Sequence, residues 1–282
     1  MVAGTVVGVG DEGIAAGEDE VLADGWEPDT DSSDTLNRAM LDNTMHELLH
    51  PAEAMGGRVE VHDEVALADL GSPTPFLNGA VLRRPVLEAG DELLDQVDAF
   101  FAGSKGPAVV YSATPTPDLR GRGWQRVGHP PLMVRAAGGE APPPPDGFTF
   151  EQVHDRTGVD HVGRILVEGY PIPELEPWRP GEPFDERILG DDRFRLFLGL
   201  DGGHPVSAAA AVVDDVVNGV HFVANDPEVR GRGFGEATVW AATLADPSKP
   251  AALISSDLGR PTYERMGYLT VTRWTVWIVP AG

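Results

Sequence analysis

Apolar positions in the first half of the chain follow two periods, one typical of helices and one typical of strands. From residue 34, apolar side chains recur along one helical face at Leu36, Met40, Met45 and Leu49, which predicts an amphipathic helix that Pro51 ends. Farther along, alternating or continuous apolar runs predict strands. The predicted strands span 57–70, 75–85 and 107–113, a helix spans 90–103, and residues 123–135 close the series.

The second half repeats this alternation. Strands are predicted at 148–153, 193–200, 205–213, 218–225, 251–256, 268–274 and 275–279, and helices at 159–170, 235–246 and 260–267. Between the halves, the run AAGGEAPPPPDG combines flexible glycine with stiff proline, which is typical of a spacer. We therefore expect a loose extension over 1–33, a domain over 34–137, a linker over 138–147 and a second domain over 148–282.

Composition narrows the function classes. The chain has 45 acidic and 21 basic residues, a formal net charge of −24, and such a surface repels the phosphates of nucleic acid. It has no cysteine, which excludes disulfides, thiolate metal sites and cysteine nucleophiles. Its apolar runs are shorter than the ~18 residues of a membrane span, and the first residues lack a signal-peptide pattern. We expect a cytoplasmic protein without nucleic-acid or membrane partners, and the oligomeric state stays open.

One short stretch, PEVRGRGFGEA at residues 227–237, concentrates arginine and glycine in this acidic chain. It lies between a predicted strand and a predicted helix, where unpaired backbone N–H groups favour an anion. Gly231, Gly233 and Gly235 let the backbone approach a ligand closely, and Arg230 and Arg232 add positive charge. The stretch predicts a pyrophosphate site, and the alternative is a surface turn with two solvated arginines.

Two motifs in this half resemble the GNAT superfamily of N-acetyltransferases, over residues 147–282. Arg230, Gly233 and Gly235 meet the signature R/Q-x-x-G-x-G/A after an apolar strand, and LISSDLGRPTYERMGYL at 253–269 is similar to the family's strand and YExxGF segment. The resemblance implies an α/β (α+β) fold with a mixed, mostly antiparallel sheet flanked by helices. It implies acetyl-CoA as the acyl donor, a small primary amine as the acceptor, and no metal.

The resemblance also implies roles for single residues. The backbone of Val223 and Asn225 would hold the acetyl group and the pantetheine arm, and Ser256 stands about where many members have an asparagine that touches the pantetheine. Tyr263 matches the tyrosine that protonates the departing thiolate. The pyrophosphate would be held by the loop residues Arg230, Gly231, Arg232, Gly233, Phe234, Gly235 and Glu236.

The sequence does not single out a general base. Glu168, on the helix expected beside the acceptor site, and Asp226, at a strand end, are candidates, and water is the alternative. Residues 168–178, EGYPIPELEPW, would line the acceptor cleft, and their glutamates suit a cationic amine.

The first half has a pattern of its own. Residues 123–135 are similar in pattern to residues 267–279, which predicts a degenerate second domain of the same kind, in tandem. Where its phosphate loop would fall, residues 85–94 offer one glycine among acids, so we expect one acetyl-CoA per chain. Two other functions stay open. One is a non-catalytic acyl-CoA sensor, and the other is a zinc hydrolase using His46, Glu47 and His50 of the HExxH match HELLH.

Overall fold

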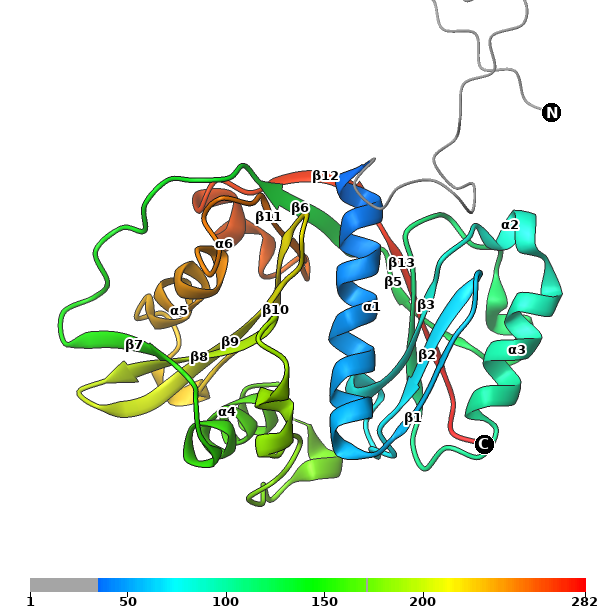
Figure 1. Ribbon diagram of the computed structural model, residues 1–282, viewed down its shortest axis with the longest axis horizontal. Helices are drawn as coiled ribbons and strands as arrows, with labels where there is room; N and C mark the ends of the chain where they lie inside the picture. Colours follow the sequence, from blue (N-terminus) through cyan, green and yellow to red (C-terminus); the bar gives the residue numbers. More distant parts are fainter. Residues whose placement is uncertain (1–34, 171) are drawn as a thin grey trace, which may run out of the picture.

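The computed structural model describes residues 35–170 and 172–282, and the extension expected over residues 1–33 lies outside them. The described chain forms two mixed sheets with one long helix, α1 (Leu36–Met55), between them (Figure 1). Helices cover the sheets, as the resemblance implied, and the expectation of an α/β fold in two tandem units is confirmed. None of the helices in the described part of the chain is both long and apolar enough to cross a bilayer.

The first sheet has six strands in the order β1-β2-β3-β4-β13-β5. Apolar residues that alternate along its strands face α1 on one side and α3 on the other, so each face has its own core. The elements are β1 (Arg58–Val61), β2 (Val65–Asp69), β3 (Asn78–Leu82), α2 (Val86–Ala89), α3 (Asp91–Phe101), β4 (Ala108–Ser112), β5 (Gln125–Gly128) and β13 (Thr275–Val279).

The second sheet has seven strands in the order β12-β6-β11-β10-β9-β8-β7. The alanine-rich strand β9 alternates so that one set of side chains packs under α4 and the other under α5. The elements are β6 (Pro131–Arg135), β7 (Phe148–Gln152), α4 (Arg156–Gly169), β8 (Phe194–Asp201), β9 (His204–Val213), β10 (Asn218–Asn225), α5 (Phe234–Thr243), β11 (Ala251–Ile254), α6 (Arg260–Arg265) and β12 (Leu269–Arg273). Short 3₁₀ turns lie at Pro75–Leu77, Leu119–Arg122, Pro173–Leu175, Glu186–Gly190 and Pro227–Val229.

The two sheets exchange one strand each, which the sequence pattern does not predict. Strand β6, from the first half, lies between β11 and β12 and pairs with both in antiparallel fashion. Strand β13, from the second half, lies between β4 and β5 of the first sheet. The similar patterns of 123–135 and 267–279 therefore end in strands that occupy equivalent places in each other's sheet. Neither sheet is complete without the other half of the chain.

Helix α1 is longer than expected, because Pro51 does not end it. A proline inside a helix removes one backbone hydrogen bond, but Pro51 and Ala52 are buried and the helix continues for another turn to Met55. Gly56 closes it in the left-handed conformation, with a φ of 80°. The helix packs on β2 and β3 of one sheet and on β9 and β10 of the other, so its residues can reach a site in the second half.

Candidate functional site

The second sheet splits open at its centre. Strands β10 and β11 pair in parallel only at Asn218 with Ala251 and Gly219 with Ala252. Beyond this point β10 carries a bulge between His221 and Ala224, where its register with β9 shifts. Phe222 has a φ of 49°, a costly conformation for a bulky residue and one that tends to occur at functional sites. The bulge turns β10 away from β11 and leaves a wedge between them.

In the first sheet, the two strands at the corresponding position, β3 and β4, do not separate. Strands β3 and β4 pair in parallel over four positions, from Gly79 with Val109 to Leu82 with Ser112. The loop after β3 leads into α2, which the sequence pattern did not predict, and through Gly90 into α3, which lies within the helix expected over 90–103. The expectation of one acetyl-CoA per chain stays a prediction, and the closed pairing favours it.

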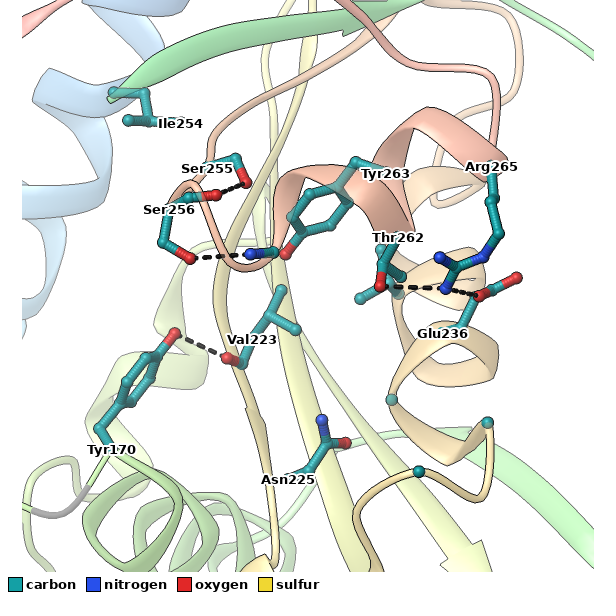
Figure 2. A pocket seen from close by; sticks show the side chains of 15 residues that line it. Tyr170, Val223, Asn225, Glu236, Ile254, Ser255, Ser256, Thr262, Tyr263 and Arg265 are labelled. Atoms are coloured by element: carbon teal, nitrogen blue, oxygen red, sulfur yellow. Dashed lines mark hydrogen bonds and ion pairs between the residues drawn. The ribbon is translucent and has the colours of Figure 1, made fainter. Parts of the chain in front are cut away.

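A cleft of about 620 Å³ fills the wedge of the second sheet, a volume typical of small-molecule sites (Figure 2). Most residues assigned from the sequence meet here. Those that line the cleft are Val223, Asn225, Gly231, Gly233, Gly235, Glu236, Ser256 and Tyr263. The loop residues Arg230, Arg232 and Phe234 do not line it. Of the segment 168–178 expected to line the acceptor cleft, Tyr170 lines this one. Residues not assigned in advance also contribute, namely Val239, Ile254, Ser255, Gly259, Thr262 and Arg265.

The start of α5 forms one end of the cleft. None of the backbone N–H groups of residues 231–236 donates a hydrogen bond to any part of the chain that the structure describes. Gly231 and Gly233 have φ values of 81° and 83°, which favour glycine, and Gly233 is the residue that precedes the helix. A row of unpaired N–H groups at the positive end of a helix is suited to bind phosphate.

The two arginines of this loop bind protein groups rather than line the cleft. Arg230 donates to the carbonyl of Gly169 at 2.7 Å, at the end of α4. Arg232 pairs with Asp201 at 2.8 Å, and its guanidinium stacks on the ring of Phe234. In this structure their charge holds the loop against α4 and β8.

Two tyrosines face each other across the wedge (Figure 2). Tyr263, on α6, packs edge-on against Tyr268, and burial raises the pKa of Tyr263 to about 12. Its hydroxyl therefore stays protonated at neutral pH, and burial alone causes the shift, with no hydrogen bond from the described residues contributing to it. Tyr170, at the end of α4, donates to the carbonyl of Val223 at 2.6 Å and so fixes the bulged strand. A proton donor and a positioned strand edge thus share the cleft.

The two carboxylates considered as general bases lie elsewhere. Glu168 accepts from Arg164 at 2.6 Å, and Asp226 lies 3.7 Å from the same guanidinium. Neither lines the cleft or the two small cavities described next. A base at Glu168 or Asp226 stays a prediction, and the geometry gives it no support. The hydroxyl of Ser256 accepts from the N–H of Gly259 at 3.0 Å and so shapes the turn before α6.

Two smaller cavities extend from the cleft toward α1. One, of about 110 Å³, shares Tyr170, Val223, Ile254 and Tyr263 with the cleft. The other, of about 130 Å³, lies between α1, α4 and β10 and shares Tyr170. Glu47 of α1 lines both of them. The first half therefore contributes a carboxylate beside the cleft of the second half.

The HExxH match does not place its three side chains on one common centre. The ring of His50 bonds to the carbonyl of Ile188 at 2.7 Å, and His46 lies 3.2 Å from Asp191. Glu47 lies 3.0 Å from His221 instead. Within the described residues, no group of three or more histidine, aspartate or glutamate side chains is placed to hold a metal ion.

Comparison with known proteins indicates the fold. No protein-family model and no curated protein matches the sequence. Among solved structures, the chain is similar to a GCN5-related N-acetyltransferase from Kribbella flavida, with 20% identity and a TM-score of 0.64 over 88% of this chain and 97% of that one. It is also similar to a putative GNAT-family acetyltransferase from Novosphingobium aromaticivorans, with 16% identity and a TM-score of 0.52 over 82% and 97% of the two chains.

A third similar structure is a functionally unknown conserved protein from Staphylococcus epidermidis, with 13% identity and a TM-score of 0.53 over 81% of this chain and 96% of that one. All three similarities extend over both halves of the chain. The GNAT fold implied by the two sequence motifs is therefore confirmed, at identities that show the fold alone.

Proposed function

We propose that the protein is an N-acyltransferase that transfers an acetyl group from acetyl-CoA to a small primary amine. The observation that carries this proposal is the meeting of three features in one cleft: the split edge of β10, the unpaired N–H groups of residues 231–236, and the protonated hydroxyl of Tyr263. The N–H groups suit the pyrophosphate, the edge of β10 suits the pantetheine arm and the acetyl group, and Tyr263 suits the departing sulfur. The three features follow one another along the cleft (Figure 2).

The donor would bind by backbone groups. The N–H groups at the start of α5 suit the pyrophosphate, and the cleft continues from there to Val223 and Tyr263. Tyr170 holds the carbonyl of Val223, so the bulge that opens the strand is supported before any ligand binds. Binding by backbone atoms of fixed geometry accounts for the glycines at 231, 233 and 235.

The proposed reaction requires few catalytic side chains. An ammonium loses one proton to solvent, the amine lone pair forms the N–C bond to the acyl carbon, and the C–S bond breaks. The nitrogen loses a second proton as the amide forms and the thiolate takes up one proton, so one proton is released overall. Tyr263 suits the last of these roles, because its hydroxyl is protonated at neutral pH and the residue lines the cleft. No step requires a metal. The proposed partner is a small amine, and the proposed compartment is the cytoplasm, where acyl-CoA donors are formed.

The test is release of free CoA. Purified protein is mixed with acetyl-CoA and a panel of primary amines, and a thiol-reactive dye reports the CoA; the chain has no cysteine to contribute background. Mass spectrometry then identifies the acetylated amine. Binding of acetyl-CoA without turnover on any amine of a broad panel would favour the acyl-CoA sensor instead.

A further inference from the structure

Helix α1 brings a polar pair from the first half against the bulged strand of the second. Asn43 and Glu47, one helical turn apart, both contact His221 of β10. The atoms are Asn43 Oδ1 with His221 Nε2 at 2.9 Å, and Glu47 Oε2 with His221 Nδ1 at 3.0 Å. The side chains of Glu47 and His221 are only 11% and 6% exposed, so water does not compete strongly for these contacts.

The hydrogen bonds of Asn43 fix the orientation of this group. Its amide nitrogen donates to the carbonyl of Val212 at 2.8 Å and to Asp214 at 2.6 Å, so its oxygen faces His221. His221 must then donate through Nε2, which leaves Nδ1 directed at the Glu47 carboxylate. The 3.0 Å contact between Nδ1 and Oε2 holds Glu47 in one orientation. Asn43 and His221 therefore position Glu47, and the second carboxylate oxygen needs another donor.

The two small cavities are the space that Glu47 faces. In the described part of the chain, Glu47 is the one acidic residue that lines either of them, neither contains lysine or arginine, and His221, the partner of Glu47, lines the smaller one. The larger one is otherwise walled by carbon-rich side chains, apart from the hydroxyl of Tyr170: Phe76, Leu77, Leu166, Ile172, Pro183, Phe184 and Phe222. Its volume of about 130 Å³ is close to the ~150 Å³ of an apolar cavity in another protein that takes up benzene.

These cavities border the thioester end of the cleft rather than the phosphate end. The smaller one shares Val223 and Tyr263 with the cleft, and Tyr170 lines all three spaces. An amine held at Glu47 therefore lies on the side of the wedge from which an acyl group beside Val223 would be approached. The Glu47 carboxylate is near enough to Tyr170 to help burial raise the pKa of that hydroxyl.

We infer that Glu47 is the residue that recognises the acceptor, and that the acceptor is a primary amine on a compact apolar body, such as an aromatic ring or a branched alkyl group. This inference rests on the proposed function. The ammonium binds the carboxylate, and the body fills the apolar cavity. In the larger cavity, an acceptor with its own carboxylate would meet the like charge of Glu47 with no basic side chain beside it, and a polyamine would bury a second cation among carbon atoms.

The experiment compares four acceptors with acetyl-CoA saturating: 2-phenylethylamine, isopentylamine, phenylalanine and putrescine. We expect the first two to have kcat/KM values at least ten times those of the last two. In Glu47→Gln, the KM for 2-phenylethylamine should rise about 10- to 100-fold, the size of a lost charge-assisted hydrogen bond, while acetyl-CoA affinity by calorimetry is unchanged. Glu53→Gln, an exposed glutamate on the same helix, is the matched control.

The role of His221 in positioning Glu47 has its own readout. In His221→Gln the side-chain amide can still donate to Glu47, so the KM for the amine should stay closer to wild type than in His221→Leu. Circular dichroism and acetyl-CoA affinity show whether each variant is folded.

A second measurement separates this inference from the proposed function. Titration of 2-phenylethylamine into protein loaded with CoA, followed by calorimetry, reports amine binding without turnover. Glu47-dependent binding without CoA release on any amine would overturn the proposed function and keep the amine site. Turnover with the same KM in Glu47→Gln, or equal use of all four acceptors, would overturn the assignment of Glu47 and leave the transferase standing.

Discussion

Replacement of Gly219 by alanine should break the contact between the two halves at α1. A Cβ at this position of β10 would lie 1.8 Å from Asn43 Oδ1 and 2.6 Å from His221 Nε2, far inside normal contact distance. Asn43 is fully buried and bonded on its other side to Val212 and Asp214, so it has no free direction in which to move. Glycine at 219 is thus what allows Asn43 and His221 to meet.

The expected size follows from two effects. Overpacking a core position costs about 1–3 kcal/mol, and leaving buried polar atoms without partners costs about 1–3 kcal/mol more. The free energy of unfolding should fall by about 2–6 kcal/mol, and Tm should fall by about 4–12 °C, at about 2 °C per kcal/mol for a chain of this size. Urea unfolding followed by tryptophan fluorescence measures it. Gly121→Ala is the control, because a Cβ there meets no atom within 4 Å and its φ is not in the left-handed region.

A double-mutant cycle checks the cause. In an Asn43→Ala background the closest clashing atom is gone, so Gly219→Ala should cost at least about 1 kcal/mol less than in the wild type. A loss under about 0.5 kcal/mol in the single variant, or strict additivity in the cycle, would refute the reasoning. The amine KM should rise in Gly219→Ala as well, since Glu47 loses its fixed partner.

Four further outcomes can be measured. Gly233→Val, which forces a β-branched residue to a φ of 83°, should abolish acetyl-CoA binding by calorimetry while the far-ultraviolet dichroism of the fold persists; normal affinity would exclude the loop as the pyrophosphate site. Tyr263→Phe should lower kcat about 100-fold at unchanged acetyl-CoA affinity, and because the pKa of this donor is raised to about 12, the wild type should show no loss of activity from its ionisation near pH 10. Calorimetry on the wild type should give about one acetyl-CoA per chain, and a ratio near two would show that the closed first sheet also binds the donor. Burial lowers the pKa of His46 to about 4, so on acidification the unfolded chain binds a proton at His46 before the folded chain does. The free energy of unfolding should therefore fall by at most about 3 kcal/mol between pH 6.5 and 4, and His46→Gln should reduce this pH dependence in urea titrations.

Local sequence patterns were sufficient to predict the helices and strands of the second half and the part of the site formed by the Arg/Gly turn and Tyr263. The strand and helix periods match the positions of β7 to β13 and α4 to α6, and the Arg/Gly turn and Tyr263 line or border one cleft. These features are local, because a helix start, a glycine conformation and an alternating strand are all set within about ten residues.

The features that the patterns missed depend on contacts between distant segments. Alternation fixes which face of β6 or β13 is buried but not which strand lies beside it, so the exchange left no local signal. Pro51 indicated a helix end, and tertiary packing around Pro51 and Ala52 overrode it. Asn43 and His221 are 178 residues apart, so no local pattern indicates their contact. The stretch HELLH was interpreted as a possible metal motif, whereas in the structure it is the helix face that presents Glu47 to the second sheet. A carboxylate in the first half, one turn from an asparagine on the same helix face, was the available signal.

The strand exchange also has a consequence for how the chain is made. Strand β13 completes the first sheet between β4 and β5, yet the ribosome produces it about 150 residues after β5, or about 7–30 s later at ordinary elongation rates. During that interval the nascent first half has unpaired strand edges at β4 and β5. Strand β6 is also unpaired, because its partners β11 and β12 have not yet been synthesised. The two halves are therefore expected to mature together after the last strand emerges, and a nascent chain stalled before residue 275 should be a substrate for chaperones rather than a folded domain.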